Sequence, residues 1–130
     1  MPLLIYQDRL NLLDREPQEN GVTQYCADHG IGFISFSPLA QGLLTDRYLN
    51  GIPADSRMAK EQYLKHSALT PELLERLKTW NAEAAERGET LAEMALAWIL
   101  QQKGVTSVLV GASSVAQLEK NMKCVHAAKL

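Results

Sequence analysis

The stretch Ile31–Ser37, with the sequence IGFISFS, decides the fold class. It is almost entirely apolar, and Pro38 follows it directly. A short, continuous apolar run that ends at a turn residue such as proline is typical of a strand buried on both faces. The residues before it, Gln18–His29, suit a helix, and Gly30 stands where a glycine commonly ends one. This part of the chain therefore predicts a helix that leads into a buried strand.

Two further apolar runs flank this segment along the chain. Pro2–Tyr6 (PLLIY) and Val105–Val110 (VTSVLV) both predict strands. The region Leu39–Ser67 shows no sustained period and contains Gly42, Gly51 and Pro53, so it predicts a long loop. A helix is expected from Thr70 as N-cap and Pro71 to its end at Gly88. Two more are expected over Leu91–Gln102 behind a Thr90/Glu93 capping box and over Val115–Val125 behind a Ser114/Gln117 capping box.

Strands that alternate with helices predict a parallel α/β sheet with both faces covered. In such folds, ligands bind at the carboxyl ends of the strands. The residues that would occupy this edge are Gln7, Phe36–Gly42 and Gly111–Gln117.

Composition limits the functional classes. The chain has 130 residues, 46% hydrophobic and 22% charged, with a formal net charge of −2. This is the composition of one globular domain, without the basic excess of a nucleic-acid or membrane-surface protein. Cys26 and Cys124 lie far apart and predict reduced thiols in a cytoplasmic protein. The three histidines lack metal-ligand spacing, so we expect no metal site, and no signal peptide is evident.

Several strand-end residues suit an anionic ligand. Val110–Ser114 runs from a strand into a helix N-terminus, which predicts a phosphate site or an ordinary capped turn. Ser37–Gly42 offers a hydroxyl, free amides and a glycine for a second phosphate, although Ser-Pro is also common turn chemistry. Arg47 and Arg57 in the following loop suit phosphate or plain solvent exposure. Phe36 suits a stacking platform or the core.

Four stretches together resemble the carboxyl-terminal half of the aldo-keto reductases. They are Ser37–Tyr48 (SPLAQGLLTDRY), Asn50–Arg57 (NGIPADSR), Leu91–Trp98 (LAEMALAW) and Ser107–Asn121 (SVLVGASSVAQLEKN). In order and spacing they cover nearly the whole chain. Within the family, the sequence is most similar to the bacterial glyceraldehyde-3-phosphate/methylglyoxal reductase type and the potassium-channel β-subunit type.

The resemblance implies an α/β fold that is part of a TIM (β/α)8 barrel, with residues 1–130 forming its carboxyl-terminal half. The three strands would be the sixth, seventh and eighth, and NADP(H) would bind at their carboxyl ends. The residues that would contact the cofactor are Gln7 at the carboxamide, Phe36 on the nicotinamide, Ser37, Leu39, Gly42 and Arg47 at the pyrophosphate, Arg57 and Ser113 at the 2′-phosphate, and Gln117 and Asn121 at the adenosine.

The resemblance also implies what this chain lacks. The family's catalytic Asp, Tyr, Lys and His come from the first half of the barrel, so no catalytic residue is assigned here. The whole enzyme would reduce small aldehydes or ketones, and this chain alone would be inactive. The alternatives are a non-catalytic NADP(H)-binding or interaction module, or a truncated remnant that pairs with the missing half-barrel or with itself. Neither nucleic acid nor membrane is expected as a partner.

Overall fold

The computed structural model describes residues 3–45 and 70–127. The chain divides into two compact units. One, the sheet unit, contains Met1–Pro38 and Glu93–Leu130. The other, the helical unit, contains Leu39–Ala92. No helix among the described residues is both long and apolar enough to cross a membrane.

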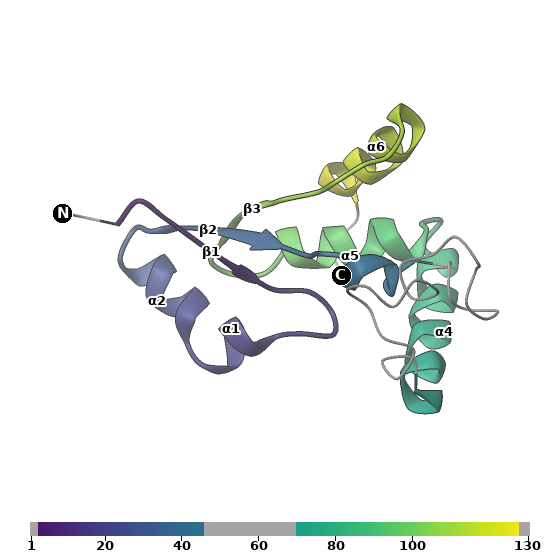
Figure 1. Cartoon of the computed structure of the whole chain (residues 1–130), viewed down its shortest axis with the longest axis horizontal. Helices are drawn as coiled ribbons and strands as arrows, with labels where there is room; N and C mark the ends of the chain where they lie inside the picture. Colours follow the sequence, from purple (N-terminus) through teal and green to yellow (C-terminus); the bar gives the residue numbers. More distant parts are fainter. Residues whose placement is uncertain (1–2, 46–69, 128–130) are drawn as a thin grey trace. The chain divides into compact units, whose positions relative to one another are not determined.

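The sheet unit is built on three parallel strands, which confirms the predicted α/β class (Figure 1). They are β1 (Ile5–Arg9), β2 (Gly32–Phe36) and β3 (Val105–Val108), in the spatial order β1-β2-β3. β1 and β2 pair without interruption, whereas β2 and β3 shift register between Phe33 and Ile34. At this bulge, the Phe33 amide donates to Thr106 Oγ1 at 3.1 Å, so a side chain supplies the acceptor that the ladder lacks.

Helices connect these strands. α1 (Glu16–Glu19) and α2 (Val22–Asp28) lie between β1 and β2, α5 (Leu91–Leu100) precedes β3, and α6 (Val115–Met122) follows it with a 3-10 turn, η4 (Lys123–His126). Gly30 has a φ of 67°, and the Ile31 amide donates to the Cys26 carbonyl at 2.9 Å. This is the Schellman ending that the sequence predicts for α2.

The single helix predicted over Gln18–His29 is wrong. The chain forms α1 and α2 instead, separated by Asn20 and Gly21. Gly21 has a φ of 86°, which interrupts the helix, and the Asn20 side chain accepts a hydrogen bond from the Val22 amide at 3.1 Å. A glycine in the left-handed region, next to an asparagine that bonds its own backbone, ends one helix and starts the next.

The core of the sheet unit lies on one face of the sheet. Phe33 from β2 packs with Leu10, Cys26 and Ile99, and all four are buried. Trp98 is among the partly buried residues packed against this cluster, so α2 and α5 both contribute to it.

The other face of the sheet is exposed along β1 and half-buried along β2 among the described residues, so the predicted cover on both faces stays a prediction. Ile5, Gln7 and Arg9 alternate along β1 and are all exposed, whereas Tyr6 and Asp8 between them are half-buried. Side chains alternate along a strand, and the core cluster to which α2 and α5 contribute lies on the Phe33 side. We call the side that carries Ile5, Gln7 and Arg9 the open face.

The helical unit contains a 3-10 turn, η1 (Ala40–Gly42), and one long helix, α4 (Pro71–Glu86). Thr70 Oγ1 accepts a hydrogen bond from the Leu73 amide at 3.1 Å, which confirms Thr70 as the N-cap. Gly88 has a φ of 73°, and the Glu89 amide donates to the Ala84 carbonyl at 2.9 Å, so the helix ends where the sequence predicts.

Tyr6 on β1 should make stability depend on pH. Its hydroxyl donates to Asp8 Oδ2 at 2.9 Å. This hydrogen bond, followed by burial and the charge of Asp8, raises the pKa of Tyr6 above its ordinary 10.0. The stabilisation is therefore fully present below pH 10 and is lost as the pH rises through the raised pKa. We expect the free energy of unfolding to fall more steeply above pH 10 in the wild type than in Tyr6→Phe, as measured by urea denaturation. Equal slopes would contradict this assignment.

Candidate cofactor site at the strand ends

The turn after β2 has an unusual backbone. Ser37, Ala40 and Gln41 have φ values of 51°, 50° and 59°, and they are the only described non-glycine residues with positive φ. This conformation is unfavourable for residues with a Cβ. Such residues concentrate at ligand-binding turns, where the surrounding structure holds them. This unusual backbone lies within Ser37–Gly42, the stretch for which the sequence predicts a phosphate site.

Hydrogen bonds from a buried side chain hold the first residue of this turn. Asn11 is 1% exposed, and its Nδ2 donates to the Ser37 carbonyl at 2.9 Å. Its Oδ1 accepts from the amides of Leu13 and Asp14 at 2.9 and 2.8 Å. Asn11 thus connects the end of β1 to the turn after β2. This residue was not predicted from the sequence; the available signal was an asparagine two residues after the end of β1.

The rest of the turn belongs to the helical unit. The Leu39 carbonyl accepts hydrogen bonds from the amides of Gly42 and Leu44 at 3.1 and 3.0 Å. Gly42 has a φ of 96°, a backbone conformation that favours glycine because it has no Cβ. Gln41 Oε1 is buried and has no hydrogen-bond partner among the described residues. Leu39 and Gly42 thus lie in a compact turn held by backbone hydrogen bonds. Any contact of theirs with a phosphate would come from the backbone.

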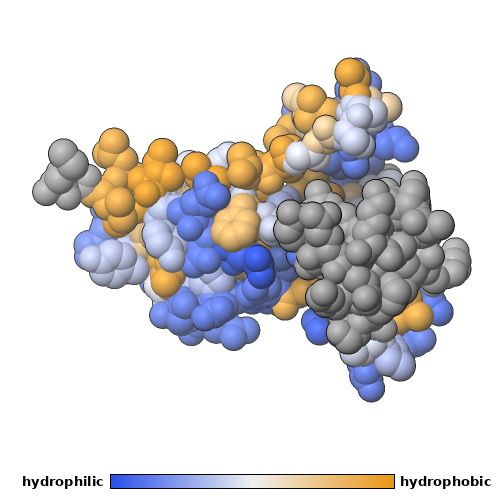
Figure 2. Space-filling model, in the orientation of Figure 1, coloured by the Kyte–Doolittle hydropathy of each residue, from blue (hydrophilic) through white to orange (hydrophobic). Residues whose placement is uncertain are grey.

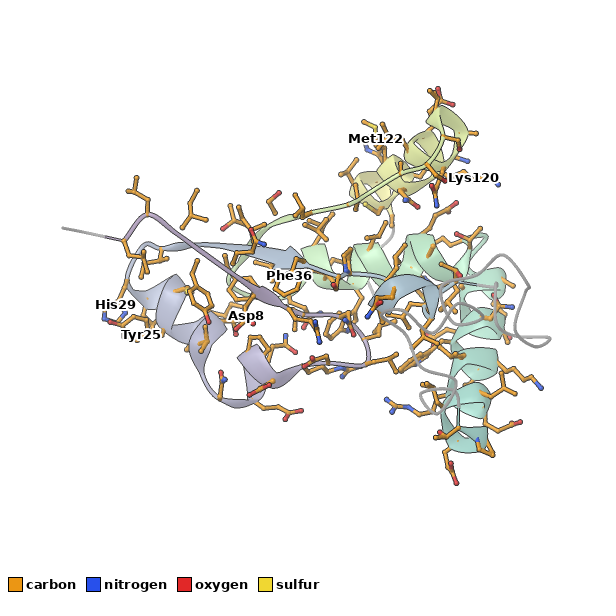
Figure 3. The ribbon with its side chains drawn as sticks, in the orientation of Figure 1. Asp8, Tyr25, His29, Phe36, Lys120 and Met122 are labelled. Atoms are coloured by element: carbon orange, nitrogen blue, oxygen red, sulfur yellow. The ribbon has the colours of Figure 1, made fainter. Side chains whose placement is uncertain are left out.

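Gln7 and Phe36 lie on the open face. Gln7 pairs in register with Ile34, and Arg9 pairs with Phe36, so all four side chains share this side of the sheet. Phe36 is half-buried at the carboxyl end of β2 (Figure 3). The guanidinium of Arg9 lies over its ring, with Cζ 5.5 Å from the centroid. Arg9 was not predicted, because its contact with Phe36 depends on strand register.

Ser113 and Gln117 form a small hydrogen-bonded group at the start of α6. Gln117 Oε1 accepts from the Ser113 amide at 2.6 Å and from Ser113 Oγ at 3.0 Å. Ser114 Oγ accepts from the Gln117 amide at 3.1 Å, which confirms Ser114 as the N-cap. The reciprocal half of the predicted capping box is replaced, because the Gln117 side chain bonds Ser113 and not Ser114. The structure thus brings together two predicted cofactor residues, both exposed.

Asn121 lies further along α6 and is 5% exposed. Its Nδ2 is buried without a hydrogen-bond partner among the described residues. A buried, unpaired donor costs free energy and calls for an acceptor that is missing. The contact of Asn121 with the adenosine end of the cofactor stays a prediction. Arg47 and Arg57, the remaining predicted residues, lie outside the described residues.

Within residues 3–45 and 70–127, no group of three His, Cys, Asp or Glu side chains is placed to hold a metal ion. Cys26 and Cys124 are free and buried. Burial raises the pKa of the Cys124 thiol, which favours its protonated, unreactive form. The polar groups at the strand ends are hydroxyls, amides and arginine.

The chain is similar to known proteins over nearly its whole length. The profile of the aldo/keto reductase family matches residues 1–130. The L-glyceraldehyde 3-phosphate reductase of Escherichia coli K12 is 47% identical over 131 residues, which cover 97% of this chain and 38% of the relative. A probable voltage-gated potassium channel subunit beta of Arabidopsis thaliana is 38% identical over 125 residues, 94% of this chain and 38% of that protein.

A solved structure shares the fold. A thermostable aldo-keto reductase in complex with the inhibitor epalrestat superposes with a TM-score of 0.65 at 22% identity, over 99% of this chain and 36% of the other. The chain thus spans well under half the length of the relatives it matches. Because the family profile matches the chain from end to end, the chain belongs to the aldo/keto reductase family.

Proposed function

We propose that this chain is the NADP(H)-binding part of an oxidoreductase that, as a whole protein, reduces small aldehydes or ketones. The observation that carries the proposal is the strained turn Ser37–Gln41 directly after β2, beside an aromatic ring on the open face. In parallel α/β folds and barrels, such strand-end turns bind phosphates. The E. coli relative is named L-glyceraldehyde 3-phosphate reductase, and this name supports reduction of an aldehyde as the reaction.

The chain's residues have distinct proposed roles. Gln7 donates and accepts hydrogen bonds at the carboxamide, and Phe36 stacks on the flat ring. The backbone at Ser37, Leu39 and Gly42 approaches the pyrophosphate, together with Arg47. Arg57 and Ser113 hold the 2′-phosphate, and Gln117 and Asn121 contact the adenosine end. When bound, NADP(H) supplies the hydride.

Two contacts of the structure bear on this binding mode. Arg9 lies over the Phe36 ring, so a stacked nicotinamide requires either the opposite ring face or displacement of Arg9. Ser113 donates hydrogen bonds from both its amide and its hydroxyl to Gln117 Oε1. The same two donors could instead bind a phosphate oxygen. Gln117 must therefore release Ser113 before Ser113 binds the 2′-phosphate.

The proposal assigns the catalytic acid to the rest of the protein, because hydride transfer to a carbonyl needs a proton donor beside its oxygen. The test is to mix the purified chain with NADPH and then with methylglyoxal or glyceraldehyde 3-phosphate. We expect a change in NADPH fluorescence on binding and no aldehyde-dependent loss of absorbance at the NADPH band. A flat fluorescence titration would contradict the binding role, and turnover by the chain alone would contradict the missing acid.

Arg57→Ala tests the preference for NADP(H) over NAD(H). A charge-assisted hydrogen bond to phosphate contributes about 1.5–3 kcal/mol, so we expect the affinity for NADPH to fall about tenfold or more while that for NADH stays nearly constant. Arg76→Ala, at an exposed arginine in the helical unit, is the matched control and should change neither affinity. Equal losses for NADPH and NADH in Arg57→Ala would remove the 2′-phosphate role.

A second candidate function is a non-catalytic module that binds NADP(H) or another protein. The 38% identity to a protein named as a probable channel β-subunit favours it. The two candidates differ once the remainder of a barrel is supplied. An enzyme part then gains aldehyde reduction, whereas a binding module continues to bind NADPH without turnover.

A further inference from the structure

One exposed arginine lies on the open face, where the nicotinamide is proposed to bind. Arg9 is the last residue of β1, and its guanidinium carbon lies 5.5 Å from the centroid of the Phe36 ring. Gln7 shares this face, two residues earlier on the same strand. Figure 2 shows hydrophilic residues next to hydrophobic ones over the ends of β1 and β2, whereas hydrophobic residues gather over the amino-terminal end of the sheet unit. A positive charge therefore accompanies the aromatic ring at the strand ends.

The neighbouring carboxylate does not form an ion pair with this charge. Asp8 Oδ1 accepts a hydrogen bond from the backbone amide of Arg9 at 2.8 Å, and Asp8 Oδ2 accepts one from the Tyr6 hydroxyl at 2.9 Å. Because side chains alternate along a strand, Asp8 and Tyr6 leave β1 on the side opposite to Arg9. Among the described residues, none forms an ion pair with the Arg9 guanidinium. Its field therefore acts on a group that stacks on Phe36.

The two forms of the cofactor differ in charge at one ring. NADPH and NADP⁺ share the adenosine, the phosphates and both riboses, whereas the nicotinamide is neutral when reduced and a cation when oxidised. The residues present suit this ring, since Gln7 offers an amide to its carboxamide and Phe36 offers a flat surface. The face of an aromatic ring attracts cations. A guanidinium already lies over Phe36, so an oxidised nicotinamide would share that ring with a second cation.

We propose that Arg9 makes this site discriminate between the oxidation states of the nicotinamide, so that NADPH binds in preference to NADP⁺. This deepens the proposed function, and it rests on that function in placing the nicotinamide against Phe36. A site with this preference takes up the reduced cofactor and releases the oxidised one, as reduction of a carbonyl requires.

The separation of the charges sets the size of the effect. Stacked aromatic rings have centroids about 4.5–7 Å apart. A nicotinamide on Phe36 is then within about 13 Å of a guanidinium that lies over either face, and closer if the guanidinium moves to the ring edge. At such separations, and at effective dielectric constants of about 20–80, repulsion between two unit charges changes an equilibrium constant about two- to tenfold.

The test measures the dissociation constants of NADPH and NADP⁺ for the full chain by isothermal titration calorimetry, at low ionic strength, where screening is weakest. The ratio of the NADP⁺ constant to the NADPH constant isolates the nicotinamide, because the rest of the two molecules is identical. We expect Arg9→Gln to lower this ratio about threefold or more, and Arg9→Glu to lower it further by reversing the charge. Arg9→Lys keeps the charge and should keep the ratio.

The matched control is Lys103→Gln. It removes one positive charge from an exposed position of the same unit, two residues before β3 and thus at the amino ends of the strands. We expect no change in the ratio, because the lysine lies at the other end of the strands from Phe36. Circular dichroism verifies that each variant is folded.

The outcomes separate this inference from the proposed function. Binding of both cofactor forms with an unchanged or raised ratio in Arg9→Gln would overturn the role of Arg9 and leave cofactor binding intact. An equal fall of the ratio in Arg9→Lys and Arg9→Gln would also overturn it, since only the second change removes the charge. Absence of binding by NADPH, by NADP⁺ and by 2′-phospho-ADP-ribose, which lacks the nicotinamide, would overturn both proposals.

Discussion

Replacing Phe33 with alanine is expected to destabilise the sheet unit by about 3–5 kcal/mol, the range for truncating a buried phenylalanine. Phe33 is fully buried between Leu10, Cys26 and Ile99, and its ring lies 6.0 Å from that of Tyr6. Removing the ring leaves a cavity where α2 and α5 pack against the sheet. Because whole domains are stable by only about 5–15 kcal/mol, a large part of the population should unfold.

The measurement is urea denaturation followed by tryptophan fluorescence in a Trp80→Phe background. This leaves Trp98, which packs against the Phe33 cluster, as the only tryptophan. Phe36→Ala is the matched control, since it removes the same side chain from the same strand on the open face, where Phe36 is only half-buried. We expect a much smaller loss of stability for Phe36→Ala, together with a loss of NADPH affinity. Equal destabilisation by the two changes would contradict the one-sided core.

Gly104→Ala is expected to produce the second large effect, a destabilisation of at least about 3 kcal/mol. Gly104 has a φ of 90°, where a Cβ is unfavourable, and a Cβ there would lie 2.6 Å from the Thr23 carbonyl oxygen. Thr23 belongs to α2 and is buried, so the carbonyl is backbone within a packed helix and has little room to retreat. The glycine allows the chain to pass close to α2 just before β3.

Gly30→Ala separates the two costs in this prediction. Gly30 also has a positive φ, 67°, but a Cβ there would meet nothing within 4 Å. We therefore expect only the conformational cost, about 1–2 kcal/mol. Both variants are measured by the same Trp98 fluorescence assay. If Gly30→Ala were as destabilising as Gly104→Ala, the close approach to Thr23 would contribute nothing.

The sequence predicted those features of the fold that depend on neighbouring residues. The apolar runs gave three strands, and Gly30, Thr70 and Gly88 marked helix ends through local backbone chemistry. The interruption at Gly21 was missed because a glycine inside a helix-like stretch is compatible with either continuation or a break. The exposure of Ile5, Gln7 and Arg9 along β1 was not predicted, because apolar content does not tell how much of a strand a single chain covers.

In the candidate site, too, the sequence predicted the local features and missed those that depend on the fold. The turn Ser37–Gly42 and the start of α6 were predicted from short local patterns, and the structure finds a strained turn and a capped helix there. Asn11 and Arg9 were not predicted. Asn11 bonds Ser37 across 26 positions, and Arg9 meets Phe36 only through the pairing register of β1 and β2. Contacts between residues distant in the sequence require the fold.

The most direct test of the account is the ¹H–¹⁵N NMR spectrum of the chain during titration with NADPH. Cofactor binding at the carboxyl ends of the strands predicts that amide signals of Gln7, Phe36, Ser37 and Ser113 shift. Signals of Gly32 and Val105, at the amino ends of β2 and β3, should stay in place. Unchanged spectra at saturating NADPH, or shifts centred on Gly32 and Val105, would contradict the account.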